Sequence, residues 1–179
     1  MIWTGPNEED DVSGPVDIFR DMHAHRRWAR DQFIGATKRL PPETHDRPFE
    51  IGRGSLLRSL VHLHEADFIW IEVLHHEAKN DIDDARFRTV AELEAALAQM
   101  DPRWNTYIEH VTPASLETEV QRFSPALNKI YSIRVRDVLT HVCTHNLYTL
   151  AQAANIIRRL GGEVPPTDFP MWVLAGRPG

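Results

Sequence analysis

Four long segments of the chain repeat apolar residues at the 3.6-residue spacing of an amphipathic helix. They span residues 16–40, 55–76, 89–110 and 135–162. Thr89 opens the third segment with the Thr-x-x-Glu pattern of a capping box. Asp101-Pro102 lies inside the same segment and predicts a kink or a short break there. Since no alternation of strands and helices accompanies these segments, the pattern predicts an antiparallel four-helix bundle.

A different pattern separates the third and fourth helical segments. Residues 117–123 and 129–133 are short, rich in β-branched and aromatic residues, and joined by Ser-Pro-Ala-Leu-Asn. This composition is typical of a small β-hairpin. The expected fold class is therefore all-α, with a hairpin before the last helix. We expect a flexible tail over residues 1–13 and one domain over residues 14–179. The last large apolar residues are expected to dock on the bundle: Phe169, Met171 and Trp172.

Composition and charge limit the partners that this chain can have. Its 179 residues are 42% hydrophobic and 26% charged, which suits one globular domain. The formal net charge of −6 argues against nucleic-acid binding, because that needs a basic face. The sequence has no apolar run of about 18 residues, so we expect no membrane span. The single cysteine, Cys143, is typical of a cytoplasmic protein and is expected to pack in the core.

Histidine is the unusual residue, with ten in the chain. His141 and His145 lie one turn apart on the last helical segment, and His145 falls within its apolar stripe. A buried imidazole needs a hydrogen-bond acceptor or a metal ion as its partner. His62, in the middle of the second segment, is the natural third imidazole, because bundles build metal sites from facing helices. The alternative is a set of partly buried histidines that bond to carboxylates or carbonyls.

The remaining histidines are weaker candidates. His25, in the first segment, is expected to pack beside Trp28. Five others lie near helix ends or off the apolar faces and are expected to be exposed to solvent: His45, His64, His75, His76 and His110. The sequence has no glycine-rich phosphate loop, nucleophile elbow or Cys-x-x-Cys motif, so the histidines are its main candidates for chemistry.

The order and spacing of these features resemble the DinB-like family, a family of four-helix bundles described as metal-dependent enzymes. The family's second-helix element, a histidine ahead of a tryptophan, resembles His62–Trp70. Its last-helix pattern HxxNHxxxHRGQ resembles His141–Gln152, and its aromatic-x-x-Trp-Ala element resembles His25–Ala29. The resemblance extends over residues 16–173 and supports the predicted bundle.

The resemblance implies a divalent metal ion, zinc or nickel, bound by His62 and His145. Thr149 stands where the family has its third histidine, and a neutral hydroxyl is a poor ligand beside imidazoles. The expected substitute is His141 from one turn earlier, or His25 from the first helix. Such a site implies a metal-dependent hydrolase or a thiol S-transferase that acts on a small-molecule substrate, with thiols the first class to test.

Two alternatives stay open. Thr149 also suits a degenerate site in a non-catalytic binding or stress-response protein, or a weak metal-binding protein without turnover. The resemblance further implies a homodimer, for which Trp3 and Trp172 are the candidate exposed aromatic residues. Neither nucleic acid nor membrane is an expected partner.

Overall fold

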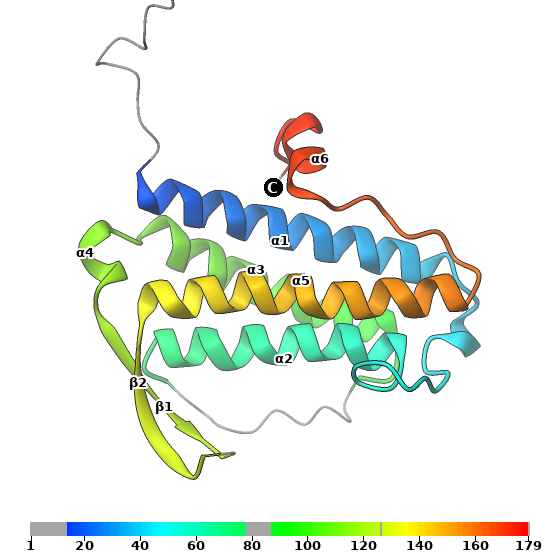
Figure 1. The fold of residues 1–179 in the computed structure, drawn as a ribbon, viewed down its shortest axis with the longest axis horizontal. Coiled ribbons are helices and arrows are strands. Elements are labelled where there is room, and N and C mark those ends of the chain that lie inside the picture. Colours follow the sequence, from blue (N-terminus) through cyan, green and yellow to red (C-terminus); the bar gives the residue numbers. More distant parts are fainter. Residues whose placement is uncertain (1–13, 78–86, 126, 179) are drawn as a thin grey trace, which may run out of the picture.

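Four long helices lie side by side along the longest axis of the molecule, as Figure 1 shows. The computed structural model describes residues 14–77, 87–125 and 127–178. The long helices are α1 Pro15–Lys38, α2 Leu56–Leu74, α3 Val90–Glu109 and α5 Val135–Arg159. The other elements are η1 Pro42–Thr44, α4 Pro113–Leu116, β1 Glu119–Ser124, β2 Lys129–Arg134 and α6 Phe169–Leu174. The predicted all-α bundle with a hairpin before its last long helix is therefore confirmed.

Neighbouring helices are antiparallel in the pairs α2/α5 and α1/α3 and parallel in the pairs α1/α5 and α2/α3. Helices α1 and α5 run in one direction, and α2 and α3 run in the other (Figure 1). Strands β1 and β2 pair antiparallel at the end of the bundle where α5 begins. Within the described ranges, no helix is long and apolar enough to cross a membrane.

Local sequence signals set the helix ends. Ser55 is the N-cap of α2, and its Oγ accepts a hydrogen bond from the backbone N–H of Arg58 at 3.2 Å. Thr89 and Glu92 form the predicted capping box at the start of α3. After α5 the chain turns at Gly161, whose φ of +79° is a conformation that glycine adopts readily.

Helix α3 runs continuously through Pro102, so of the predicted kink or short break the break is absent from this helix. Proline removes one backbone hydrogen bond, but packing on either side opposes that loss. Met100 and Trp104 are buried at 4% and 0% exposure. Tertiary packing of these two side chains therefore outweighs the local effect of the proline.

The core consists of two apolar clusters, one toward each end of the bundle. Representative members of the first are Phe33, Leu60, Leu97 and Ile156. Representative members of the second are Ile71, Trp104, Val138 and Leu139. A layer of buried polar side chains lies between the clusters along α1, α2 and α5, and we call it the polar belt. It comprises His23, Arg26, Arg30, His64, Asp67 and Asn146.

Ion pairs between helices hold the charges of the polar belt. Arg26 Nη1 donates to both carboxylate oxygens of Asp67, at 2.7 and 2.8 Å. Arg30 makes a similar two-point contact with Asp101, at 2.8 Å for each bond. The Arg26 and Asp67 side chains are only 1% and 4% exposed. Removing either partner from a pair this deeply buried would leave an uncompensated charge.

Two surface predictions are wrong. His64 was predicted to be exposed to solvent, but it is 1% exposed and its ring packs edge-on to Phe87. The buried face of α2 is wider than the stripe of apolar residues on this helix. Trp172 is also 1% exposed, and its Nε1 donates to the carbonyl of Pro178 at 2.9 Å. Its ring is thus used in docking α6, as predicted, and is not free to meet a second copy. Met171 is 41% exposed, so for this residue the docking prediction is wrong. Trp3 and the rest of residues 1–13 lie outside the described residues, and the homodimer stays a prediction.

His23 in the polar belt is expected to make stability depend on pH. Burial, followed by the positive charges of Arg26, Arg27 and Arg30, lowers its pKa well below the ordinary value of 6.5. Below pH 6.5 the unfolded chain therefore binds a proton that the folded chain does not, so stability falls as the pH falls. Between pH 7.5 and 5.5 this residue should account for about 1.4 kcal/mol.

Urea unfolding of the wild type and of His23→Gln at both pH values measures this contribution. The loss of unfolding free energy between pH 7.5 and 5.5 should be smaller in His23→Gln by about 1.4 kcal/mol. Equal losses in the two proteins would contradict the assignment to His23.

Candidate functional site

Helices α2 and α5 bring two histidines together from distant parts of the chain. His62 of α2 and His145 of α5 face each other with their Nε2 atoms 3.2 Å apart. The ring centroids are 4.9 Å apart, and the ring planes are inclined at 70°. Both side chains are partly buried, and that of His62 is 28% exposed. The pair that the resemblance implied is thus assembled at one point between the two helices.

A carboxylate orients the first of these rings. Glu65 lies one turn after His62 on α2, and its Oε2 is 2.9 Å from His62 Nδ1. Because an ionised carboxylate only accepts hydrogen bonds, we assign the proton of the His62 ring to Nδ1. His62 Nε2 then keeps its lone pair and accepts the Nε2–H of His145. A histidine that donates one ring N–H to a carboxylate while offering the other nitrogen is the usual arrangement of a metal-binding imidazole.

The second ring is neutral at physiological pH. Burial, with smaller contributions from the neighbouring His62 and His141, lowers the pKa of His145 to about 4. Burial and the positive charge of Arg122 also lower the pKa of His141. Neutral imidazoles keep a lone pair for a metal ion or a hydrogen-bond donor, so both residues are chemically suited to bind one.

The geometry fits two ligands of one ion. Zinc binds imidazole nitrogens at about 2.0–2.1 Å, so two tetrahedral ligands lie about 3.3–3.4 Å apart, close to the distance in the His62–His145 pair. Among residues 14–77, 87–125 and 127–178, however, no group of three or more His, Cys, Asp or Glu side chains is placed to hold a metal ion. The described residues therefore bring together two imidazoles at a spacing that suits one ion, without a third side chain of these types beside them.

The two residues that flank His145 on α5 differ in their access to the pair. His141, one turn earlier, is exposed, with its ring centroid 5.5 Å from that of His145 and 5.2 Å from that of Trp70. Thr149, one turn later, is 1% exposed. His141 is therefore the nearer histidine with room to move, and Thr149 occupies a tightly packed position.

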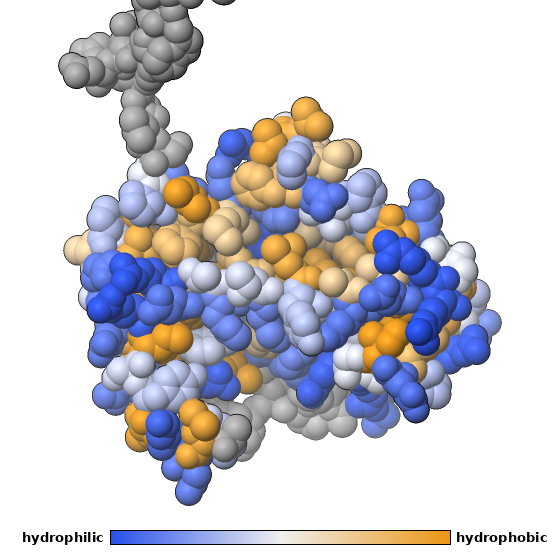
Figure 2. Space-filling model, viewed as in Figure 1, coloured by the Kyte–Doolittle hydropathy of each residue, from blue (hydrophilic) through white to orange (hydrophobic). Residues whose placement is uncertain are grey.

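His25 is placed away from the pair. Its Nε2 lies 2.8 Å from the carbonyl oxygen of Thr167, and its ring packs against Phe169 and Trp172 of α6. It lines a hollow of about 520 Å³ between α1, α5 and the C-terminal segment. In Figure 2, hydrophobic residues gather over α6 and along the seam between α1 and α5. The structure thus gives His25 a packing role against the C-terminal segment and does not bring it to His62.

Cys143 lines the same hollow and is buried, as predicted. Burial raises the pKa of its thiol to about 11. The thiol stays protonated at neutral pH, and a protonated buried thiol is a poor nucleophile.

Glu65 was not among the candidate site residues predicted from the sequence. The signal was present, because His62 and Glu65 are three residues apart on a helix and such residues are neighbours on its surface. Their contact links the histidine pair to a second hollow beside α2, which Glu65 also lines.

Comparison with known proteins gives consistent matches. The sequence model of the DinB family matches residues 15–174. Protein DinB of Bacillus subtilis strain 168 is 21% identical over 166 residues, which cover 88% of this chain and 95% of that protein. A solved DinB-like protein from Bacillus cereus ATCC 10987 has a TM-score of 0.66 and 13% sequence identity, over 87% of this chain and 99% of that one. At such low identity the structural likeness establishes the fold alone.

Proposed function

This chain belongs to the DinB family, and from that premise we propose that it binds a divalent metal ion between α2 and α5 through His62 and His145. The observation that carries the proposal is the 3.2 Å approach of the two Nε2 atoms, with Glu65 bonded to the far side of His62. When bound there, zinc or nickel supplies Lewis acidity, which lowers the pKa of a coordinated water or thiol. The proposed reaction is hydrolysis or thiol S-transfer on a small molecule.

Each residue of the site has a separate part in this proposal. Glu65 fixes the tautomer and the ring orientation of His62, so that its Nε2 faces His145. His145 is available as a neutral ligand because its pKa is lowered to about 4. His141 is the proposed third ligand, since its exposed ring lies one turn away and a change of rotamer moves it without disturbing the core.

A second candidate function rests on Thr149. A buried threonine occupies the position of the family's third histidine, and the described residues hold no three-ligand group. The alternative is therefore a non-catalytic binding protein in which His62 and His145 form only a partly buried hydrogen-bonded pair. Metal content separates the two candidates, because only the first requires a bound ion.

Replacing His62 with alanine is expected to remove metal without unfolding the protein. The side chain is 28% exposed, so its truncation leaves the apolar clusters intact. Loss of the hydrogen-bond partner of a metal ligand typically lowers metal affinity by roughly 10–100-fold. Loss of the ligand itself should lower the affinity for zinc by more than that. Elemental analysis of untagged protein after incubation with zinc and removal of free metal measures the content.

His110→Ala is the matched control for this experiment. His110 is exposed just after α3, and its Nδ1 donates to the carbonyl of Thr106 one turn earlier. Its replacement should leave metal content unchanged. Zinc that survives His62→Ala at the wild-type level would rule out the proposed site, and a wild type that takes up no zinc or nickel would favour the non-catalytic alternative.

A further inference from the structure

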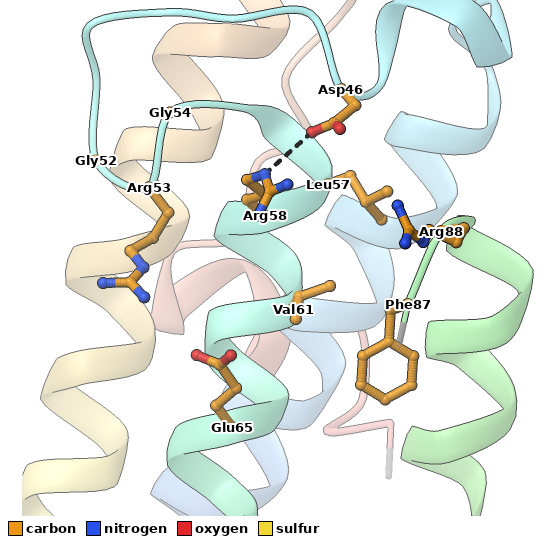
Figure 3. A pocket seen from close by; sticks show the side chains of 10 residues that line it. All are labelled: Asp46, Gly52, Arg53, Gly54, Leu57, Arg58, Val61, Glu65, Phe87 and Arg88. Carbon is orange, nitrogen blue, oxygen red and sulfur yellow. Dashed lines mark ion pairs between the residues drawn. The ribbon is translucent and has the colours of Figure 1, made fainter. Parts of the chain in front are cut away.

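A hollow of about 390 Å³ lies beside the first turns of α2, and Figure 3 shows the side chains that line it. Leu57, Val61 and Glu65 form its floor, because residues four apart share one face of a helix. The volume falls within the range of about 300–1,000 Å³ typical of small-molecule sites. The hollow therefore combines an apolar floor with a carboxylate at its inner end.

Charged side chains line the rim of this hollow. Arg53, Arg58 and Arg88 lie among the lining residues together with Asp46 and Glu65, so the lining carries one more positive than negative charge. Arg58 is partly neutralised, since its Nε lies 3.5 Å from Asp46 Oδ1. The hollow also borders the N-terminus of α2, where the helix dipole favours negative charge. These groups together suit an anionic ligand.

The loop that forms one wall of the hollow is held in place. Gly52 has a φ of +53°, and a Cβ at this position would lie 2.2 Å from Oε1 of Gln152 on α5. Glycine therefore allows the loop to approach α5 closely. The backbone N–H of Phe49 donates to the carbonyl of Gly54 at 2.7 Å, which closes the loop. The position of Arg53 is thus fixed at its backbone.

Glu65 presents an unused acceptor at this site. The residue is 6% exposed, and its Oε2 is occupied by His62 Nδ1. Its Oε1 is buried and has no hydrogen-bond partner among the described residues. In Figure 3 the carboxylate turns along α2 toward the side on which Arg53 descends from the loop. A buried carboxylate oxygen calls for a donor, so a ligand that enters the hollow is expected to supply one.

We propose that the hollow binds a small organic anion whose carboxylate or phosphate groups meet the arginine rim and whose hydroxyl or ammonium group donates to Glu65 Oε1. Such an anion would be the substrate of the proposed function. Turnover of the bound anion rests on that function, whereas its binding does not. Glu65 joins the two regions, because one of its oxygens holds His62 and the residue also lines the hollow. A ligand bound there lies next to the histidine pair.

Citrate and tricarballylate test the proposal, because the two acids differ only in the hydroxyl group of citrate. Titration calorimetry on chelator-treated, metal-free protein measures binding without the proposed ion. The wild type should bind citrate more tightly than tricarballylate. Arg88→Gln should weaken both by about 10-fold, the scale of one charge-assisted hydrogen bond. Glu65→Gln should abolish the preference for citrate, because an amide NH₂ in place of Oε1 cannot accept the hydroxyl proton.

Arg136→Gln is the matched control for charge. Arg136 pairs with Glu117 at the opposite end of the bundle, so its replacement should leave both affinities unchanged. A wild type that binds neither acid, or equal losses in Arg88→Gln and Arg136→Gln, would overturn the proposal. Equal affinity of the wild type for both acids would overturn the role of Glu65. This comparison uses the wild type alone, so it does not depend on the folding of a variant. Citrate binding by a protein that never takes up metal would contradict the proposed function alone.

Discussion

Replacing Thr149 with histidine is expected to raise the affinity for zinc or nickel by more than about 100-fold, beyond the roughly 10–100-fold effect of a ligand's hydrogen-bond partner. Thr149 follows His145 by one helical turn, so an imidazole there lies on the same face of α5. Three imidazoles with an open position form the donor set of a catalytic zinc site. Competition with a chromogenic chelator measures the change.

Thr144→His is the control, because Thr144 is exposed and adjacent to His145 but points about 100° away around the helix. It should leave the affinity unchanged. Thr149 is tightly packed, so folding of the variant is checked by its melting temperature with and without zinc. A ligand that binds only the folded state raises that temperature. A folded Thr149→His protein with wild-type affinity would exclude a degenerate family site.

Replacing Asp67 with alanine is expected to cost about 3–5 kcal/mol of the free energy of unfolding. The change leaves the Arg26 guanidinium buried without its carboxylate, although its Nε still donates to His23 Nδ1 and the group still lies over the Trp104 ring. Domains are typically stable by only about 5–15 kcal/mol, so the loss is a large share of the total. Urea unfolding followed by circular dichroism gives the value.

Two further variants separate burial from charge in this experiment. Glu94→Ala breaks the exposed pair with Lys38 and should cost at most about 1 kcal/mol. The double variant Arg26→Met, Asp67→Leu removes both charges together and should recover most of the stability, because an apolar pair carries no desolvation penalty. A double variant no more stable than Asp67→Ala would show that the charges themselves are required.

The sequence predicted the elements that depend on local chemistry. Helix α2 begins at its Ser55 cap and α3 at the Thr89–Glu92 capping box, because each signal acts within one helical turn. The hairpin followed from two short β-rich segments around a turn. Spacing and position in the helices pointed to His141, His145 and His62, the resemblance implied the pair His62 and His145, and the fold brings that pair together.

The rest of the site depends on contacts between distant residues. His64 looked solvent-exposed because the apolar stripe of α2 omits it, yet charged and polar residues fill much of the buried arc of that helix. Asp67 is buried only because Arg26, 41 positions earlier, neutralises it. Glu65 gains its role from the hollow beside α2. Hydrophobic periodicity carries no information about such partners, so it underestimates burial wherever polar residues pair across helices.

The polar belt also fixes the register of the helices. A slide of α1 along α2 by one turn, about 5.4 Å, would place the Arg26 guanidinium against Leu63 or Ile71, which flank Asp67 on the same face. Neither side chain accepts a hydrogen bond, so the charge would be stranded in an apolar cluster. Apolar ridges alone tolerate such shifts, whereas one buried ion pair permits a single alignment. The same alignment sets the axial level of α2, and with it the level at which His62 meets His145.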